Sequence, residues 1–307
     1  MKVLFMGTPR FAEIVLQELL KNNFDVVGVV CRADKPAGRG NKLVSPNIVS
    51  LARENNIEVY QFENLSEKID EFKKIDYDVA VTASYGRMLP KAFLDIAPVV
   101  NVHPSLLPKY RGATPIQNTL LNGDSVTGVT IMKTDVGMDD GDIYLQKSLE
   151  VLPEDDYASL LDKLALLGAE LLIKTLRNIE KGTAQTLKQN HDQATFVKPI
   201  KKEEGLLNFS ESIETLVNKV RAFAESPVAY LFIGNDRIKI YKAKIATDIE
   251  SVQTVGEIIP NKKRFLIQAN GGVFEVLKCQ SAGGKILDSA SFLNGYRFKS
   301  KAVDLWF

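Results

Sequence analysis

The segment "KVLFMGTPRFAEIVLQELLKNNFDVVGVVC" (residues 2–31) decides the fold class of this chain. Residues 2–7 form a short apolar run that ends at a glycine, residues 10–22 have apolar side chains at helical spacing, and residues 25–31 form a second apolar run. A buried strand, an amphipathic helix and another buried strand make a right-handed crossover unit, in which the two strands are parallel. The segment therefore predicts an α/β sheet.

The same alternation continues toward the C-terminus. Strand-like runs occur at 57–62, 78–84 and 99–103, and most of the gaps hold segments with helical spacing, such as 46–56 and 65–75. Strands alternating with helices predict an open, mostly parallel, Rossmann-like sheet with helices on both faces.

The pattern changes after residue 125. Two strand-like runs, 126–134 and 141–151, are joined by a short turn-rich connection, which predicts a hairpin added to the sheet, and a long helix is expected at about 156–181. We place an N-terminal domain at 1–182 and a polar linker at 183–204.

Residues 205–307 differ again in pattern. After one helical segment at 212–223, short β runs follow one another, separated by turns rich in glycine and asparagine. Several short strands in about a hundred residues predict a small C-terminal β-barrel, and an OB-like barrel is the commonest such module that binds other molecules.

Composition excludes several classes of protein. The 39 basic and 38 acidic residues of the 307 give a net charge of +1, so no global field draws the chain to nucleic acid or membrane. Cys31 and Cys279 lie far apart, which argues against structural zinc and against a disulfide framework. Without a signal peptide or an apolar run of membrane-spanning length, the chain is expected to be soluble, cytoplasmic and without membrane contact.

The first turn of the sheet does not match a dinucleotide-binding fingerprint. The sequence "GTPRFA" holds Gly7 alone, where that fingerprint needs three glycines to let the backbone approach a pyrophosphate. Pro9 suits the start of a helix. An NAD-dependent enzyme is therefore disfavoured, and so is a P-loop, whose motif is missing.

The stretch "NVHPSLLPKYRG" (101–112) carries the first candidate site residues. Asn101 and His103 are two apart in a strand, so they share a face, and Pro104 keeps His103 in extended geometry. Ligands of open α/β sheets bind at the carboxyl ends of the strands. The pair is therefore expected to face a ligand, although a lone histidine at a strand end is more often a structural residue.

The later stretch "DVGMDDGD" (135–142) places four carboxylates around two glycines. An amide, an imidazole and a carboxylate together suit acyl transfer, in which the amide binds the developing oxyanion and the carboxylate supports a protonated imidazole. On its own the stretch is more often a solvated turn, or conceivably a calcium loop, although the EF-hand spacing does not fit. No serine or cysteine nucleophile motif is present, which favours direct attack by an amine.

The combination of "NVHPSLLPKYRGATPIQ" with "TGVTIMKTDVGMDDGDI" resembles the formyltransferase family that uses 10-formyltetrahydrofolate. The resemblance implies that Asn101, His103 and Asp139 are catalytic. It further implies that the folate is bound by two segments, whose residues are Ser105, Leu106, Leu107 and Pro108 in the first, and Arg87, Met88 and Leu89, within 83–90, in the second.

Members of this family differ in their formyl acceptor, and loop 32–46 separates them. It holds Arg32, Lys35, Arg39 and Lys42 among glycines and prolines, as suits phosphate contacts, although four scattered charges are usually just a solvated loop. The sequence "KPAGRGNKL" resembles the loop by which some members reach the acceptor stem of initiator tRNA. Segment 221–244 resembles the start of the C-terminal domain of those members.

The resemblance therefore implies formyl transfer from 10-formyltetrahydrofolate, without a metal, to the α-amino group of methionyl initiator tRNA, for the initiation of translation. We expect a monomer in which 1–182 is catalytic, 205–307 binds tRNA, and Arg39, Lys42 and Lys35 contact the tRNA. A sugar-nucleotide formyltransferase and a non-catalytic binder of folate or tRNA are the alternatives. The basic loop disfavours the first, and the intact set of Asn101, His103 and Asp139 argues against the second.

Overall fold

The computed structural model describes residues 1–37, 42–62, 64–298 and 300–305, with the backbone alone at 35–37 and 42–44. The chain forms two compact units, each assembled from three segments: Met1–Pro115, Val126–Glu150 and Leu161–Lys198 for the first, and Ile116–Ser125, Val151–Leu160 and Pro199–Phe307 for the second. Residues 183–198 of the predicted linker thus belong to the first unit. The predicted domains are continuous stretches of sequence that end at 182 and begin at 205, and these boundaries remain a prediction.

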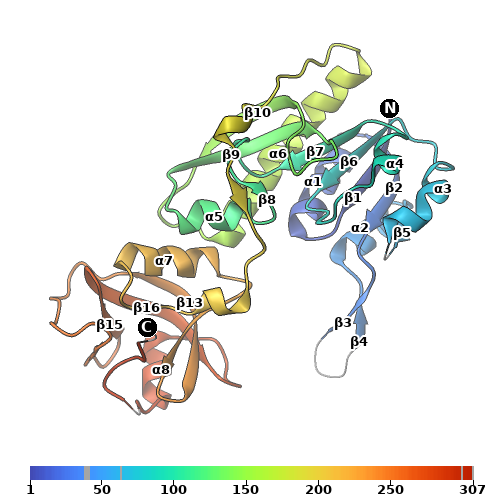
Figure 1. Cartoon of the computed structure of the whole chain (residues 1–307). Helices are drawn as coiled ribbons and strands as arrows, with labels where there is room; N and C mark the ends of the chain where they lie inside the picture. Colours follow the sequence, from blue (N-terminus) through green and yellow to red (C-terminus); the bar gives the residue numbers. More distant parts are fainter. Residues whose placement is uncertain (38–41, 63, 299, 306–307) are drawn as a thin grey trace. The chain divides into compact units, whose positions relative to one another are not determined.

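A seven-stranded sheet carries the first unit in the part of the chain that the structure describes, with the order β10-β9-β7-β6-β1-β2-β5 (Figure 1). Its strands are β1 (Lys2–Gly7), β2 (Asp25–Cys31), β5 (Glu58–Gln61), β6 (Val79–Ala83), β7 (Val99–His103), β9 (Val126–Lys133) and β10 (Ile143–Glu150). The five strands from β5 to β7 are parallel, whereas β9 is antiparallel to β7 and to β10. The predicted Rossmann-like sheet with an added hairpin is confirmed.

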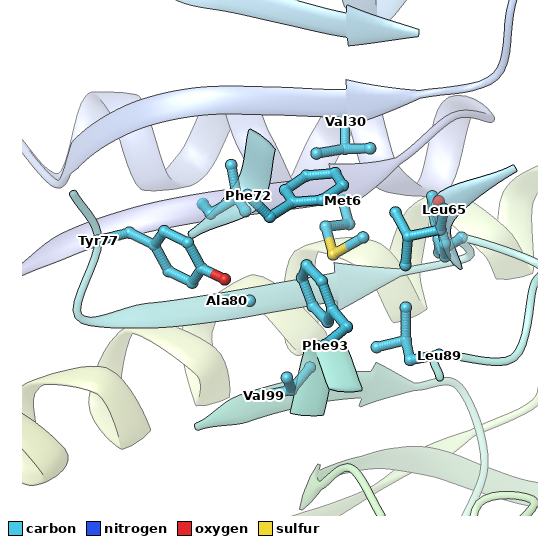
Figure 2. Close-up of a cluster of buried hydrophobic side chains, with 11 residues drawn as sticks. Met6, Val30, Leu65, Phe72, Tyr77, Ala80, Leu89, Phe93 and Val99 are labelled. Carbon is cyan, nitrogen blue, oxygen red and sulfur yellow. The ribbon is translucent and has the colours of Figure 1, made fainter. Parts of the chain in front are cut away.

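One face of this sheet packs against short helices. The helices are α3 (Ile69–Phe72), which follows the 3₁₀ helix η1 (Leu65–Lys68), and α4 (Lys91–Leu94). Figure 2 shows Phe72 and Phe93 packed edge to face, with ring centroids 5.1 Å apart, over Met6 of β1 and Val99 of β7. Both rings are fully buried, so they anchor the two helices to the sheet.

The opposite face is covered by α1 (Arg10–Lys21) and α6 (Tyr157–Glu180). The approach of α6 is closest at Gly168, where an added Cβ would lie 2.6 Å from the Val102 side chain of β7 and 3.8 Å from the ring of Phe11 in α1. Val102 therefore faces α6. Asn101 and His103, one residue to either side, face the other way.

The remaining elements of this unit were only partly predicted. The helix predicted over 65–75 is broken into η1 and α3, which bury Leu65 and Phe72 in the core while Ile69 packs against it partly buried. The predicted loop 32–46 holds the paired strands β3 (Lys35–Ala37) and β4 (Lys42–Val44). Helix α2 (Asn47–Glu54) was expected, whereas two short parallel strands, β8 (Arg111–Gly112) and β11 (Phe196–Val197), were not.

The second unit is built on a curled antiparallel sheet. Among the described residues its order is β12-β13-β16-β15-β14, with β17 paired to β16. The strands are β12 (Ala229–Ile233), β13 (Asp236–Ile245), β14 (Ile258–Ile259), β15 (Phe265–Ala269), β16 (Gly272–Ser281) and β17 (Leu287–Asp288). The expected small C-terminal β structure is confirmed.

Two helices of the second unit bury apolar side chains. Helix α7 (Ile213–Ala222) was predicted and buries Ile213, Leu216 and Val220, whereas α8 (Ser289–Gly295), which stacks Phe292 on Phe265 at 5.7 Å, was not predicted. Most of helix α5 (Pro115–Leu121) and the 3₁₀ helix η3 (Lys202–Gly205) also belong to this unit, whereas the 3₁₀ helix η2 (His191–Gln193) belongs to the first unit. In the described residues of both units, no helix combines the length and the apolar character that crossing a membrane requires.

Candidate active site

Strand β7 ends in Asn101 and His103, at the carboxyl edge of the parallel part of the sheet. Asn101 lies opposite Thr82 of β6, and His103 lies opposite Thr130 of β9. The imidazole is buried, with 4% of its residue surface exposed, whereas Asn101 is half-buried. The structure therefore places both residues on one face, at the edge where open α/β sheets bind ligands.

Asp139 reaches this pair from the turn between β9 and β10. Its Oδ1 atom accepts a hydrogen bond from Asn101 Nδ2 at 3.3 Å, and its Oδ2 atom accepts one from the backbone N–H of Gly112 at 2.7 Å. The Oδ2 atom also lies 3.7 Å from His103 Nδ1. The structure thus brings together the amide, imidazole and carboxylate that the sequence singled out.

The tautomer of His103 follows from the partner of its other ring nitrogen. Nε2 lies 2.9 Å from the carbonyl oxygen of Tyr110, and a carbonyl can only accept, so Nε2 carries a proton and donates it. Nδ1 is therefore the atom that gains or loses a proton. It faces the Asp139 carboxylate at a distance too long for a hydrogen bond but short enough to stabilise a protonated ring.

The orientation of the Asn101 amide is settled in the same way. The Asp139 carboxylate can only accept, so Nδ2 must face it, and Oδ1 then accepts from the hydroxyl of Thr82 at 3.1 Å. The bond from Nδ2 to Asp139 is long, so a stronger acceptor can replace it. Asn101 therefore presents an N–H donor that is oriented before any ligand arrives.

Left-handed backbone conformations gather around these residues. Ser84 after β6, Tyr110 after β7 and Asp139 have φ angles of +47°, +61° and +49°. Residues other than glycine rarely adopt this region, and doing so costs about 1–3 kcal/mol each. Such strain persists where the surrounding structure enforces it, as is typical of functional sites.

The predicted folate segment after β7 uses most of its side chains in the fold. The hydroxyl of Ser105 is buried and donates to the carbonyl of Lys109 at 2.6 Å. Leu107 is buried, and Leu106 lies against Gly128 of β9. Pro108, half-buried, accepts at its carbonyl from the N–H of Thr195. The backbone is engaged as well, since the carbonyls of Ser105 and Leu107 accept from the side chains of Thr130 and Gln146.

The predicted folate segment after β6 is more open. Met88 is 59% exposed, and Arg87 is exposed while its guanidinium donates to the carbonyl of Phe62 at 2.9 Å. Leu89, in contrast, is buried in the core cluster shown in Figure 2. Because β6 and β7 are parallel neighbours, the two predicted folate segments leave the same edge of the sheet.

Two of the three predicted tRNA contacts, Lys35 and Lys42, lie in the paired strands β3 and β4. Arg39 falls outside the described residues. Lys35 begins β3 and Lys42 begins β4, with Lys35 opposite Val44 and Ala37 opposite Lys42 in an antiparallel pair. The backbone of this basic segment is therefore a hairpin after β2 rather than the loop that the sequence predicted.

Neither cysteine is suited to nucleophilic chemistry. Burial raises the pKa of the Cys31 thiol to about 11 and that of the Cys279 thiol to about 12, so both stay protonated near neutral pH. Within residues 1–37, 42–62, 64–298 and 300–305, no group of three or more His, Cys, Asp or Glu side chains is placed to hold a metal ion.

Sequence reasoning did not identify the groups that hold the three site residues in place. These are the hydroxyl of Thr82, the carbonyl of Tyr110, the N–H of Gly112 and the side chains of Gln189 and Thr195. The backbone groups leave no signal in a sequence. Gln189 and Thr195 lie in the segment interpreted as a linker, where polar composition concealed them.

Two family models of formyl transferases match this chain, one in its N-terminal part and one in its C-terminal part. The family model described as "Formyl transferase" matches residues 1–176, and the model described as "Formyl transferase, C-terminal domain" matches residues 199–297. Together these two matches cover most of the chain.

Curated relatives match along nearly the full length. The chain is 41% identical over 298 residues to the methionyl-tRNA formyltransferase of Lactobacillus johnsonii, covering 95% of each chain. It is 39% identical over 307 residues to the methionyl-tRNA formyltransferase of Sulfurihydrogenibium sp., covering 98% of each.

Solved structures share the fold at low identity. HypX from Aquifex aeolicus matches with a TM-score of 0.71 and 15% identity, over 97% of this chain and 48% of that one. WlaRD, a sugar 3N-formyl transferase crystallised with dTDP and 5-N-formyl-THF, matches with a TM-score of 0.68 and 22% identity, over 93% and 99% of the two chains. At these identities the likeness establishes the architecture alone.

Proposed function

Because this chain belongs to the formyl transferase family, we propose that it transfers the formyl group of 10-formyltetrahydrofolate to the α-amino group of methionyl initiator tRNA. Methionyl-tRNA formyltransferases match both units at about 40% identity, and the chain is an enzyme that prepares methionyl-tRNA for translation initiation. We further propose that it acts as a cytoplasmic monomer, without a metal ion.

The observation that carries the proposed chemistry is the convergence of Asn101, His103 and Asp139 at the carboxyl edge of the sheet. Asn101 offers an oriented N–H donor, His103 offers a ring nitrogen that can take a proton, and Asp139 offers the charge that stabilises the protonated ring. Formyl transfer to an amine needs an oxyanion donor and a proton acceptor. The three groups supply both.

In the reaction that we propose, the α-amine nitrogen of the aminoacyl-tRNA forms a bond to the formyl carbon, and the bond from that carbon to the folate nitrogen breaks. Asn101 Nδ2 gives up its long bond to Asp139 and donates to the oxyanion. His103 Nδ1 accepts the proton that the amine loses and delivers it to the departing nitrogen, while Asp139 stabilises the intervening imidazolium. Neither step requires a covalent enzyme intermediate.

We place the formyl donor along the two segments that leave β6 and β7 at this edge, 87–89 and 105–108. Met88 presents exposed apolar surface for a flat heterocycle. Ser105, Leu107 and Leu89 have buried side chains, so their part is to shape the segments that meet the ligand. For the acceptor, we propose that Arg39, Lys42 and Lys35 contact tRNA phosphates and that 205–307 also binds tRNA.

The test is a formyl-transfer assay with four acceptors: methionyl initiator tRNA, the same tRNA uncharged, a methionyl elongator tRNA and an amino-sugar nucleotide. The formylated product is identified by mass spectrometry after mild hydrolysis of the ester. We expect formyl-methionine from the charged initiator tRNA. Faster formylation of the amino-sugar nucleotide would replace the proposed acceptor, and no product from any acceptor would refute formyl transfer.

A further inference from the structure

Gln189 is a buried amide that touches the catalytic turn from a distant part of the chain. Only 5% of its surface is exposed. Its Nε2 atom donates to the carbonyl oxygens of Asp139, at 2.9 Å, and of Gly141, at 2.7 Å. Its Oε1 atom accepts from Arg111 Nε at 3.2 Å and from Arg111 Nη2 at 2.7 Å.

These partners leave the amide a single orientation. Carbonyl oxygens can only accept and a guanidinium can only donate, so Nε2 must face the turn and Oε1 must face Arg111. Both N–H groups and both lone pairs of the amide are used. Gln189 therefore forms a rigid link between the β9–β10 turn and β8, which holds Arg111.

The turn to which Gln189 donates its hydrogen bonds is the one that carries Asp139. Asp139 has a left-handed φ of +49°, and an added Cβ at Gly141 would lie 1.8 Å from the carbonyl oxygen of Lys133. A backbone this tight and strained needs outside support to persist. The two carbonyls that Gln189 binds, at positions 139 and 141, span the point where the Asp139 side chain departs.

The other end of the link leads back to the same carboxylate. Arg111 is 4% exposed, and its Nη2 atom also contacts Nδ1 of His191 at 3.1 Å. The next residue, Gly112, donates its N–H to Asp139 Oδ2. Gln189 thus ties the main chain of Asp139 to the strand whose backbone binds the side chain of Asp139.

We propose that Gln189 is a positioning residue for Asp139, setting the backbone from which the carboxylate meets Asn101 and His103. For its kinetic consequences this inference rests on the proposed formyl transfer. The segment that carries Gln189 also carries Thr195, whose hydroxyl accepts from the N–H of Tyr110, the residue that holds His103 Nε2. Residues 189–195 therefore support two of the three site residues.

The sharpest variant is Gln189→Glu, which keeps the shape and the acceptor for Arg111 but loses both donors to the turn. We expect kcat to fall on the order of 10- to 100-fold, as for a small misplacement of a reacting group, with the KM of the formyl donor changed less than about two-fold. Gln189→Leu, which also loses the Arg111 contact, should lower the melting temperature further.

Gln268 provides a matched control in the second unit. It is also 5% exposed, its Nε2 atom donates to the carbonyls of Ala269 and Gly272, and its Oε1 atom accepts from the N–H of Val252. Gln268→Glu suffers the same chemical change in a place that does not touch Asp139. It should lower the melting temperature and leave the contacts of Asp139 unchanged.

Two readouts separate positioning from general destabilisation. In an Asp139→Asn background, adding Gln189→Glu should change kcat less than about three-fold, since the group being positioned has already lost its charge. Independently of catalysis, the Gly112 amide should exchange its hydrogen at least about ten-fold faster in Gln189→Glu, and at the wild-type rate in Gln268→Glu.

The proposal is overturned if the Gly112 exchange rate is unchanged in Gln189→Glu. It is also overturned if the fold-losses in kcat from Gln189→Glu and Asp139→Asn multiply in the double variant. Because amide exchange needs no substrate, it decides the role of Gln189 even if the wild-type protein transfers no formyl group. A wild-type protein that transfers no formyl group would refute the proposed function and leave the inference about Gln189 intact.

Discussion

The proton on Nε2 of His103 determines which nitrogen of the ring can take part in chemistry. The Tyr110 carbonyl fixes the proton on Nε2, so the chemistry is confined to Nδ1, beside Asp139. A histidine free to choose its tautomer would present the wrong nitrogen part of the time. The left-handed backbone of Tyr110, at φ +61°, is what turns its carbonyl toward the ring.

The first prediction concerns the three side chains that we propose to be catalytic. His103→Ala and Asn101→Ala should each lower kcat by about 10²–10⁴-fold, the range for losing a proton acceptor or an oxyanion donor. Asp139→Asn should be comparably inactive, because the protonated ring loses its charge partner. Stopped-flow or quenched formyl-transfer assays measure this, with circular dichroism as the folding control. Near-normal turnover by His103→Ala would remove His103 from the mechanism.

The cysteines give a contrasting prediction. Both thiols have raised pKa values and are buried, so neither supplies a thiolate at neutral pH. The double variant Cys31→Ser, Cys279→Ser should keep kcat within about two-fold. Its free energy of unfolding should drop by about 1–3 kcal/mol for each hydroxyl that finds no partner. A large loss of kcat with unchanged folding would point to thiol chemistry.

At the scale of elements, the edge of the sheet does most to build the site. Parallel neighbours β6 and β7 release their following segments at one edge. Strand β9 is antiparallel to β7 and ends opposite Val100, so the β9–β10 turn has to fold back along the sheet to bring Asp139 to Asn101. Strand direction alone therefore brings 83–90 and 101–108 together, whereas 135–142 joins them through the contacts of Asp139 with Asn101 and Gly112.

Element pairing in the second unit makes a prediction about pH. Arg264, before β15, donates two bonds to Glu275 of β16, at 2.8 Å and 2.6 Å, and two more to Asp248. The hydrogen bonds from Arg264 hold the pKa of the Glu275 carboxyl below its usual 4.5. A lowered native pKa means stabilisation that is complete above about pH 4.5 and disappears as the pH falls through the native value.

Glu275→Gln should therefore lower the free energy of unfolding by about 1–3 kcal/mol at pH 7, since it breaks a mostly buried ion pair. The gap between variant and wild type should remain at pH 5 and shrink at pH 3, because the stabilisation from the lowered pKa of Glu275 is lost progressively below about pH 4.5. Calorimetric unfolding at the three pH values measures the gap. A gap that is equal at pH 7 and pH 3 would mean that charge contributes nothing to this contact.

At the scale of the whole molecule, each compact unit is assembled from distant stretches of chain. Arg221 of α7 shows how the second unit recruits residues from the middle of the sequence, for it donates to the carbonyls of Leu152 and Asp155 at 2.9 Å and 2.6 Å. A chain ending near residue 205 would leave both carbonyls without this partner. Truncation is therefore a poor way to isolate the first unit.

Substitution in the full chain separates the two substrates instead. If Arg39 contacts a tRNA phosphate, Arg39→Ala should raise the KM of methionyl-tRNA and leave the affinity for the formyl donor unchanged. The dependence of log affinity on log salt should become shallower by about 0.7–0.9, the contribution of one phosphate contact. Tyr60→Phe, a neutral change on β5, serves as a control. Identical tRNA kinetics at every salt concentration would show that Arg39 makes no phosphate contact.

The sequence by itself determined the sheet, its hairpin, the two-part organisation and the pairing of Asn101 with His103 on one face. These follow from periods of about two and 3.6 residues, which are local properties written into the order of side chains. The resemblance carried by the same stretch also picked out Asp139. The segment 183–204 had no such period, and its polar residues left no local sign of what they bind.

Only the tertiary structure decided which groups hold the site together. Asn101 and Asp139 are 38 residues apart, and Gln189 lies a further 50 residues beyond Asp139. The carbonyl of Tyr110 and the N–H of Gly112 belong to the backbone, which is chemically the same at every position. Long-range packing selects which of these identical groups meets an imidazole or a carboxylate, and so the support of the three site residues emerges only when the chain has folded.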